Sequence, residues 1–179
     1  MQGLLIIDIQ NDYFPGGAFP LAGPEEAAAA ASRLLAGFRS AGGPVVHLQH
    51  VWDAPDAEFM RPGTEGVEIN AAVAPRGGEL VLTKEAPNGF LGTGLETELR
   101  NREVDQLVVA GMMTSTCVDA TVRAAADLGF EVTLAHDACA APDLEFGGIT
   151  VPAASVHAAF VAAMAADYAD ARAADEIEI

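Results

Sequence analysis

Three chemically reactive side chains lie at or just after the ends of apolar runs in the sequence. Asp8 and Lys84 each close a run of aliphatic residues, and Cys117 follows the apolar run Gln106–Ala110 after a short turn. If these runs are parallel strands of one sheet, the three side chains lie at the edge where ligands bind. A thiol, a carboxylate that accepts its proton and an ammonium that holds the carboxylate are the parts of nucleophilic catalysis. The plainer alternatives are a structural ion pair between Asp8 and Lys84 and a small apolar cysteine that fills a strand–helix contact.

The residues after Cys117 have a helical pattern that ends near Leu128, where Gly129 supplies a stop. Backbone N–H groups at the start of a helix lack intrahelical partners and carry partial positive charge. We therefore expect the helix to lower the pKa of the Cys117 thiol and to increase the fraction that is present as thiolate.

Apolar runs of strand length alternate with helical patterns along the chain. This alternation predicts an α/β fold, a three-layer αβα sandwich around a mostly parallel sheet of five or six strands. The expected strands are Gly3–Ile9, Pro44–Val51, Glu79–Lys84, Gln106–Ala110, Phe130–Ala135 and a weaker Ala169–Ala174. The expected helices are Pro24–Ala41 with Pro24 in its first turn, Thr93–Asn101 with Thr93 as N-cap, Cys117–Leu128, Val151–Tyr168 and a short turn near Val67–Ala72. No repeat or change of composition divides the chain, so we expect residues 1–179 to form one domain.

The composition is 51% hydrophobic, and the formal net charge is −17 over 179 residues. Such an acidic surface repels phosphate backbones, so we expect no nucleic-acid partner. No apolar stretch approaches the ~20 residues that cross a bilayer. The first apolar run breaks at Asp8 and has no basic region before it, unlike a signal peptide. Two cysteines, Cys117 and Cys139, are too few for a disulfide framework, so we expect a cytoplasmic protein with reduced thiols and no membrane partner.

The segments around the three candidate residues resemble a known family. Their order and spacing are similar to those of the isochorismatase-like cysteine hydrolases. The matching segments are Leu5–Phe14, Thr83–Lys84, Gly111–Val118 with Thr121 and Arg123, Asp127–Phe130 and Asp137–Ala140. The resemblance covers essentially the whole chain. That family includes nicotinamidases, N-carbamoylsarcosine amidases, ureidoacrylate amidases and streptothricin hydrolases, and it has a Rossmann-like fold.

The resemblance implies a role for each candidate residue. Cys117 would be the nucleophile, Asp8 the general base and Lys84 the partner of Asp8. A cis peptide bond between Met112 and Met113 would aim the N–H of Met113, together with that of Cys117, at a developing oxyanion. The implied reaction is hydrolysis of an amide-type C–N bond in a small molecule through a thioester, without a cofactor, in a homodimer or homotetramer.

Two histidines lie where nicotinamidases place metal ligands, but the metal pattern is incomplete. No third histidine follows His47 and His50 before His136, and isolated imidazoles make a poor zinc site. We therefore expect no metal, a structural role for His47, and His50 as a residue that lines the pocket or caps an element. The other expected pocket residues are Phe14, Asn88 and Phe90.

Two other functions remain open. One is hydrolysis of a vinyl ether without a covalent intermediate, as in the isochorismatase branch, although that branch typically lacks the cysteine found at Cys117. The other is a catalytically silent binding protein, against which the intact set of three residues argues. We expect Cys139 to be an inert buried thiol and His157 to be packed or exposed to solvent rather than catalytic. The loops Tyr13–Gly23 and Trp52–Pro75 would set specificity, and their sequence does not identify the substrate.

Overall fold

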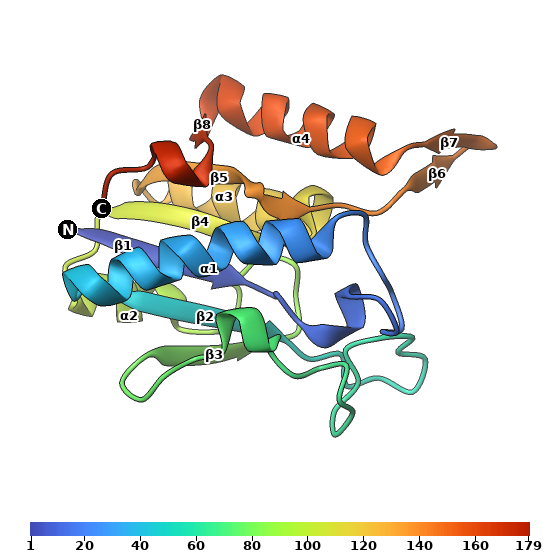
Figure 1. The fold of residues 1–179 in the computed structure, drawn as a ribbon, viewed down its shortest axis with the longest axis horizontal. Coiled ribbons are helices and arrows are strands. Elements are labelled where there is room, and N and C mark those ends of the chain that lie inside the picture. Colours follow the sequence, from blue (N-terminus) through green and yellow to red (C-terminus); the bar gives the residue numbers. More distant parts are fainter.

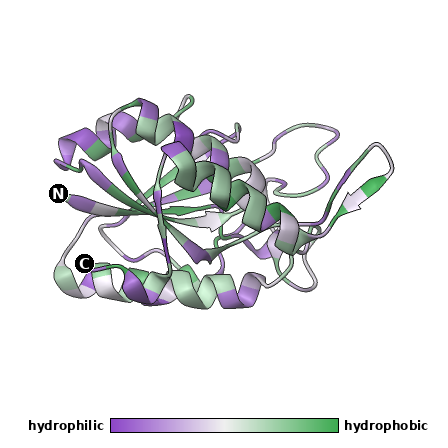
Figure 2. Cartoon of the chain, turned by 90° about the horizontal axis from the view of Figure 1, so that it is seen from above, coloured by the Kyte–Doolittle hydropathy of each residue, from purple (hydrophilic) through white to green (hydrophobic).

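The computed structural model describes residues 1–179 as a central sheet between two layers of helices (Figures 1 and 2). The strands of the sheet are β1 (Gln2–Ile7), β2 (Val45–His50), β3 (Leu80–Lys84), β4 (Gln106–Met112), β5 (Glu131–Ala140) and β8 (Asp170–Arg172). The helices are α1 (Pro24–Ala41), α2 (Leu95–Asn101), α3 (Asp119–Asp127) and α4 (Ala153–Asp167), with short turns η1 (Asn11–Tyr13), η2 (Ala71–Val73), η3 (Thr114–Val118) and η4 (Ala174–Glu176). The six strands lie in the order β3-β2-β1-β4-β5-β8, and every neighbouring pair is parallel. The predicted three-layer α/β architecture is confirmed.

The two faces of the sheet form two separate apolar cores. On β1, Leu4 and Ile6 belong to the core under α1, whereas Leu5 and Ile7 belong to the core under α2, α3 and α4. Alternate residues of a strand point to opposite faces. A strand that is covered on both faces therefore needs the continuous apolar run seen in the sequence.

The direction of winding reverses between β1 and β4. From β1 the chain winds outward through β2 to β3, and from β4 it winds the other way through β5 to β8. The carboxyl ends of β1 and β4 therefore flank a topological switch point, where ligands bind in open α/β sheets. Asp8 follows β1, and the turn that contains Cys117 follows β4. The topology thus places both residues beside the switch point.

β5 is longer than the sequence indicated. The apolar run ends at Ala135, but the strand continues through His136 and Asp137 to Ala140. Beyond an irregularity in the ladder, Cys139 pairs with Gly111 of β4, so the backbone stays within the sheet. The Asp137 carboxylate accepts a hydrogen bond of 2.7 Å from the backbone N–H of Ala174. The expected end at Ala135 was wrong because the Asp137 carboxylate finds a partner without the strand leaving the sheet.

A hairpin that the sequence analysis did not predict precedes α4. Its strands are β6 (Leu144–Phe146) and β7 (Ile149–Val151), and it projects from the body of the molecule (Figure 1). Gly147 and Gly148 connect the strands with φ angles of 60° and 77°, which the favoured two-residue hairpin turns require. Because β7 ends at Val151, α4 begins at Ala153 and not at Val151 as expected, with Pro152 as its N-cap.

The other element boundaries differ little from expectation. Pro24 does open α1, but the N-cap of α2 is Gly94 and not Thr93. The Thr93 hydroxyl still accepts a hydrogen bond of 3.1 Å from the N–H of Leu95. The short helical turn expected near Val67–Ala72 lies at η2, and the weak last strand is β8. No helix combines the length and the apolar character needed to cross a membrane.

Candidate active site

The structure brings the three candidate residues together at the carboxyl edge of the sheet. Lys84, the last residue of β3, places its Nζ atom 2.7 Å from the Asp8 Oδ2 atom. The Cys117 Sγ, a carboxylate oxygen of Asp8 and a ring nitrogen of His50 all lie within 4.8 Å of one another. Asp8 is 0% exposed, Lys84 2% and Cys117 4%. A nucleophile, a candidate base and a fixed positive charge therefore share one site that is nearly closed to solvent.

The Lys84 ammonium is fully coordinated by oxygen and nitrogen acceptors. Besides its ion pair with Asp8, it donates to the carbonyl oxygen of Ala86 at 3.0 Å and to His50 Nδ1 at 3.1 Å. An ammonium has three donors and no acceptor, so His50 Nδ1 must be unprotonated. Burial, assisted by the charge of Lys84, lowers the pKa of His50 to about 4. His50 is therefore neutral at physiological pH, with its proton on Nε2.

The expected lowering of the Cys117 pKa was wrong. Burial, followed by the negative charge of Asp8, raises the pKa of this thiol to about 12, although Lys84 acts in the opposite direction. Cys117 also lies inside the turn η3, ahead of the first residue of α3, Asp119. Desolvation and a neighbouring carboxylate thus outweigh the field of the helix. At rest the site contains a thiol beside Asp8, and Asp8 has its own pKa raised by burial against the opposing effect of Lys84.

The backbone around the site has an unusual conformation at several positions. Asp8 adopts a left-handed conformation with φ of 51°, and the peptide bond between Met112 and Met113 is cis. At Gly111, with φ of 151°, a Cβ atom would lie 2.1 Å from the carbonyl oxygen of Ile7. Only glycine fits there, because β4 approaches β1 closely at the point where the turn begins.

The four expected pocket residues have different surroundings. His50 is hydrogen-bonded to Lys84 and belongs to the centre. Phe14 packs against the core under α1 and lines a cavity of about 960 Å³ formed with the loop residues near η1 and η2. The Asn88 carboxamide oxygen accepts a hydrogen bond of 2.9 Å from the N–H of Phe90 and so stabilises the local turn. The Phe90 ring packs against Phe130, with 5.9 Å between ring centroids.

Sequence reasoning missed the residue that holds His50 in place. Gln10 is completely buried, and its carboxamide donates to the carbonyl oxygen of His50 and accepts from its N–H, both at 2.8 Å. A third hydrogen bond of 2.7 Å joins Gln10 to the carbonyl oxygen of Val67. The only signal in the sequence was a polar residue two positions after Asp8, which carries no information on its partners.

The two histidines of β2 occupy different environments. His47 is buried and lies 3.0 Å from the Glu79 carboxylate, which also pairs with Arg39 at 2.6 Å. Near His50, the ligand atoms of Asp8 and Cys117 converge in a way that could suit a metal. The Lys84 ammonium, however, already contacts two of these three groups and supplies the positive charge there.

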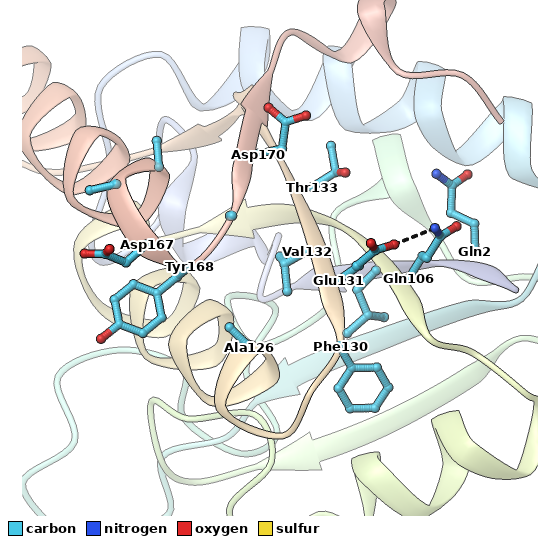
Figure 3. A pocket seen from close by; sticks show the side chains of 14 residues that line it. Gln2, Gln106, Ala126, Phe130, Glu131, Val132, Thr133, Asp167, Tyr168 and Asp170 are labelled. Atoms are coloured by element: carbon cyan, nitrogen blue, oxygen red, sulfur yellow. Dashed lines mark hydrogen bonds between the residues drawn. The ribbon is translucent and has the colours of Figure 1, made fainter.

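A cavity of about 610 Å³ lies at the opposite edge of the sheet (Figure 3). Its lining includes the first residues of three strands, Gln2, Gln106 and Glu131, and the end of α4 near Tyr168. Gln106 donates a hydrogen bond of 2.6 Å to the Glu131 carboxylate across this cavity. Asp8, Lys84 and Cys117, which together form the candidate triad, lie at the carboxyl edge of the sheet. This cavity is therefore not part of the candidate site.

Known proteins resemble this chain in both sequence and fold. The Isochorismatase domain model matches residues 2–171. A solved structure of an isochorismatase-family hydrolase from Oleispira antarctica matches with a TM-score of 0.94 and 49% identity, over 98% of this chain and 94% of that one. Streptothricin hydrolase from Streptomyces noursei is 38% identical over 100% of this chain and 62% of its own length. N-carbamoylsarcosine amidase from Thermoplasma acidophilum matches with a TM-score of 0.84 and 25% identity over 99% of each chain. The chain therefore belongs to the isochorismatase family of hydrolases.

Proposed function

We propose that the protein is a cysteine hydrolase that cleaves an amide-type C–N bond of a small molecule through a thioester on Cys117. The buried cluster of Cys117, Asp8 and Lys84 carries this proposal, because it contains a nucleophile, a base and a counter-charge in contact. The similarity to N-carbamoylsarcosine amidase from Thermoplasma acidophilum supports an amide-type bond as the target.

The proposed reaction begins with the resting thiol. As Sγ attacks the substrate carbonyl carbon, Asp8 accepts the thiol proton, so that free thiolate need not accumulate at a site where the pKa is raised to about 12. Lys84 opposes the effect of burial on Asp8, favours its ionised form and orients the carboxylate before this step. The N–H groups of Met113 and Cys117 would stabilise the oxyanion of the tetrahedral intermediate.

Collapse of that intermediate breaks the C–N bond and leaves the acyl group on sulfur. Protonated Asp8 donates its proton to the departing nitrogen, which leaves as an amine or ammonia. Water then attacks the thioester, with Asp8 as base, and releases a carboxylic acid and the Cys117 thiol. His50 stays neutral throughout, and its lone pair holds one donor of the Lys84 ammonium.

We extend the proposal to the setting of the enzyme. Its two cysteines are free, which suits a reducing compartment such as the cytoplasm. We propose a homodimer or homotetramer that acts on a small molecule, with neither a nucleic-acid nor a membrane partner. Metal analysis of the purified protein tests the expected absence of a metal, because stoichiometric zinc or iron would contradict it.

An amidase screen tests the proposed chemistry. The panel contains nicotinamide, N-carbamoyl compounds, ureido acids and cyclic lactams, with release of amine or ammonia as the signal. We expect turnover by the wild type to be abolished in Cys117→Ala, and an acyl adduct on Cys117 to be visible by mass spectrometry. Cys139→Ala is the matched control, since this second buried thiol lies outside the cluster and its loss should preserve turnover. Full turnover by Cys117→Ala would rule out the nucleophile, and activity on a vinyl ether alone would favour the non-covalent reaction.

A further inference from the structure

A hydrogen bond joins helix α4 to the turn that contains Cys117. The hydroxyl of Thr114, a residue that is 0% exposed, lies 3.0 Å from Nδ1 of His157. Thr114 opens the turn η3, whereas His157 belongs to α4. A buried hydroxyl needs a partner, and here the partner comes from a distant part of the chain.

Thr114 lies between the two backbone groups that the proposed mechanism uses. It directly follows Met113, and Cys117 belongs to the same turn. The carbonyl oxygen of Met113 accepts hydrogen bonds from the N–H groups of Thr116 at 3.1 Å and Val118 at 3.2 Å, so the turn closes on Met113. A displacement of the Thr114 side chain would therefore also displace the N–H groups of Met113 and Cys117.

His157 is held firmly at the amino-terminal part of α4. Ala153 and Val156 are buried there, and the N–H of Ala153 donates a hydrogen bond of 2.7 Å to the Asp143 carboxylate. Most of the remaining helix is exposed, apart from the fully buried Met164. The end of α4 that faces the turn is thus a fixed support for the imidazole.

The His157 imidazole is not one of the groups that react in the proposed mechanism. Burial, with a smaller effect of His136, lowers the pKa of His157, which favours the neutral ring. The neutral ring forms a hydrogen bond with the Thr114 hydroxyl either as donor or as acceptor, depending on the tautomer. Its influence on the reaction must therefore pass through Thr114.

We propose that His157 is a positioning residue, whose hydrogen bond to Thr114 fixes the turn that presents the N–H groups of Met113 and Cys117 to the oxyanion. This inference rests on the proposed function. Interactions with an oxyanion form only in the transition state, so their misplacement lowers kcat much more than it raises KM. The hydrogen bond contacts neither the Cys117 thiol nor Asp8, so we expect the reactivity of the thiol to change much less than kcat.

Substitution at both ends of the hydrogen bond tests the proposal on a substrate from the amidase screen. We expect His157→Leu and Thr114→Val each to lower kcat about 10- to 100-fold with KM changed less than about threefold. The double variant should be no worse than the poorer single variant, because both remove the same interaction. His157→Gln, which retains a hydrogen-bonding group, should recover most of the lost kcat. Alkylation of Cys117 by iodoacetamide should stay within about twofold of the wild-type rate in every variant.

Met164→Ala is the control for a merely structural effect. It removes a buried side chain from the same helix, so we expect it to lower the melting temperature and to leave kcat near the wild-type value well below that temperature. The positioning role is overturned if His157→Leu lowers kcat no more than Met164→Ala, or if the effects of the His157 and Thr114 variants are additive. Cys117→Ala in the same assay separates the two proposals. If it retains turnover, both fail; if it is inactive while His157→Leu is unimpaired, only the positioning role fails.

Discussion

Replacement of Lys84 by methionine removes a buried charge and leaves Asp8 without its counter-ion. At the observed distance of 2.7 Å, the gross attraction is about 6 kcal/mol for an effective dielectric constant of about 20. Loss of one partner from a buried pair costs a net ~3–5 kcal/mol of folding free energy. For a chain of this size, that loss corresponds to a decrease in melting temperature of about 6–20 °C. The methionine side chain keeps most of the lysine volume, so packing contributes little to the effect.

The pH dependence of this loss follows from the ionisation of Asp8. Burial already raises the pKa of Asp8 above its ordinary 3.8, and without Lys84 the main opposing influence is gone. When the pKa of a carboxyl is raised in the folded state, the fold is most stable at low pH, where the carboxyl is protonated. The folded state then loses stability as the pH rises towards the raised pKa. The Lys84→Met variant should therefore be closest to the wild type near pH 4 and fall progressively behind it towards pH 8. Because loss of Lys84 favours the protonated form of Asp8, which cannot accept the thiol proton, turnover should fall about 10²–10⁴-fold.

Urea unfolding between pH 4 and pH 8, with turnover measured in parallel, provides the assay. The matched control is Asp8→Asn combined with Lys84→Met, which removes both charges and should regain stability without regaining activity. A Lys84→Met variant with the wild-type dependence of stability on pH would refute the argument that Lys84 neutralises Asp8. Wild-type turnover in that variant would refute its role in catalysis.

Three further outcomes are expected. Alkylation of Cys117 by iodoacetamide should rise about tenfold per pH unit up to at least pH 10, because its pKa is raised to about 12, and a plateau near pH 7 would show a resting thiolate instead. Gly111→Ala should destabilise the fold by about 3 kcal/mol in thermal or urea unfolding, since the new Cβ would lie 2.1 Å from the carbonyl oxygen of Ile7, and an unchanged stability would contradict this. Hydrogen bonding to Arg39 is the main cause that lowers the pKa of Glu79 to about 2 from 4.5, so its contribution is complete above pH 4.5 and is lost as the pH falls towards 2. Glu79→Gln should therefore cost about 1–3 kcal/mol in urea unfolding at pH 7 and much less at pH 2, whereas an equal cost at both would contradict this.

The arrangement of the strand ends could be predicted from the sequence because few topologies fit its pattern. Apolar runs buried on both faces imply parallel strands, and parallel strands bring their carboxyl ends to one edge. Asp8 and Lys84 were expected at that edge for this reason, and they lie in contact there. Burial of a charge at the end of an apolar run was a usable signal, since such a charge needs a partner.

Features that depend on neighbours in space could not be predicted in this way. The thiol pKa was expected to fall because the start of the helix was visible in the sequence, whereas the degree to which Cys117 is buried was not, and burial is the largest cause of the raised pKa. Gln10 and His157 act through partners far along the chain, for which the sequence has no local pattern. The prediction that the fifth strand ends at Ala135 failed for the same reason, because the hydrogen bond between Asp137 and Ala174 becomes apparent only in the folded chain.

Because the triad is buried, the ionic strength of the solution should have little effect on the chemical step. Dissolved salt screens exposed charges over about 8 Å at physiological concentration, but it reaches buried pairs poorly. The ion pair of Asp8 and Lys84 is nearly inaccessible, while the net charge of −17 is carried largely by exposed side chains. Added salt should therefore leave kcat almost unchanged and act on the encounter with substrate, slowing cationic substrates and assisting anionic ones. The direction in which salt changes kcat/KM thus gives the sign of the charge on an unidentified substrate.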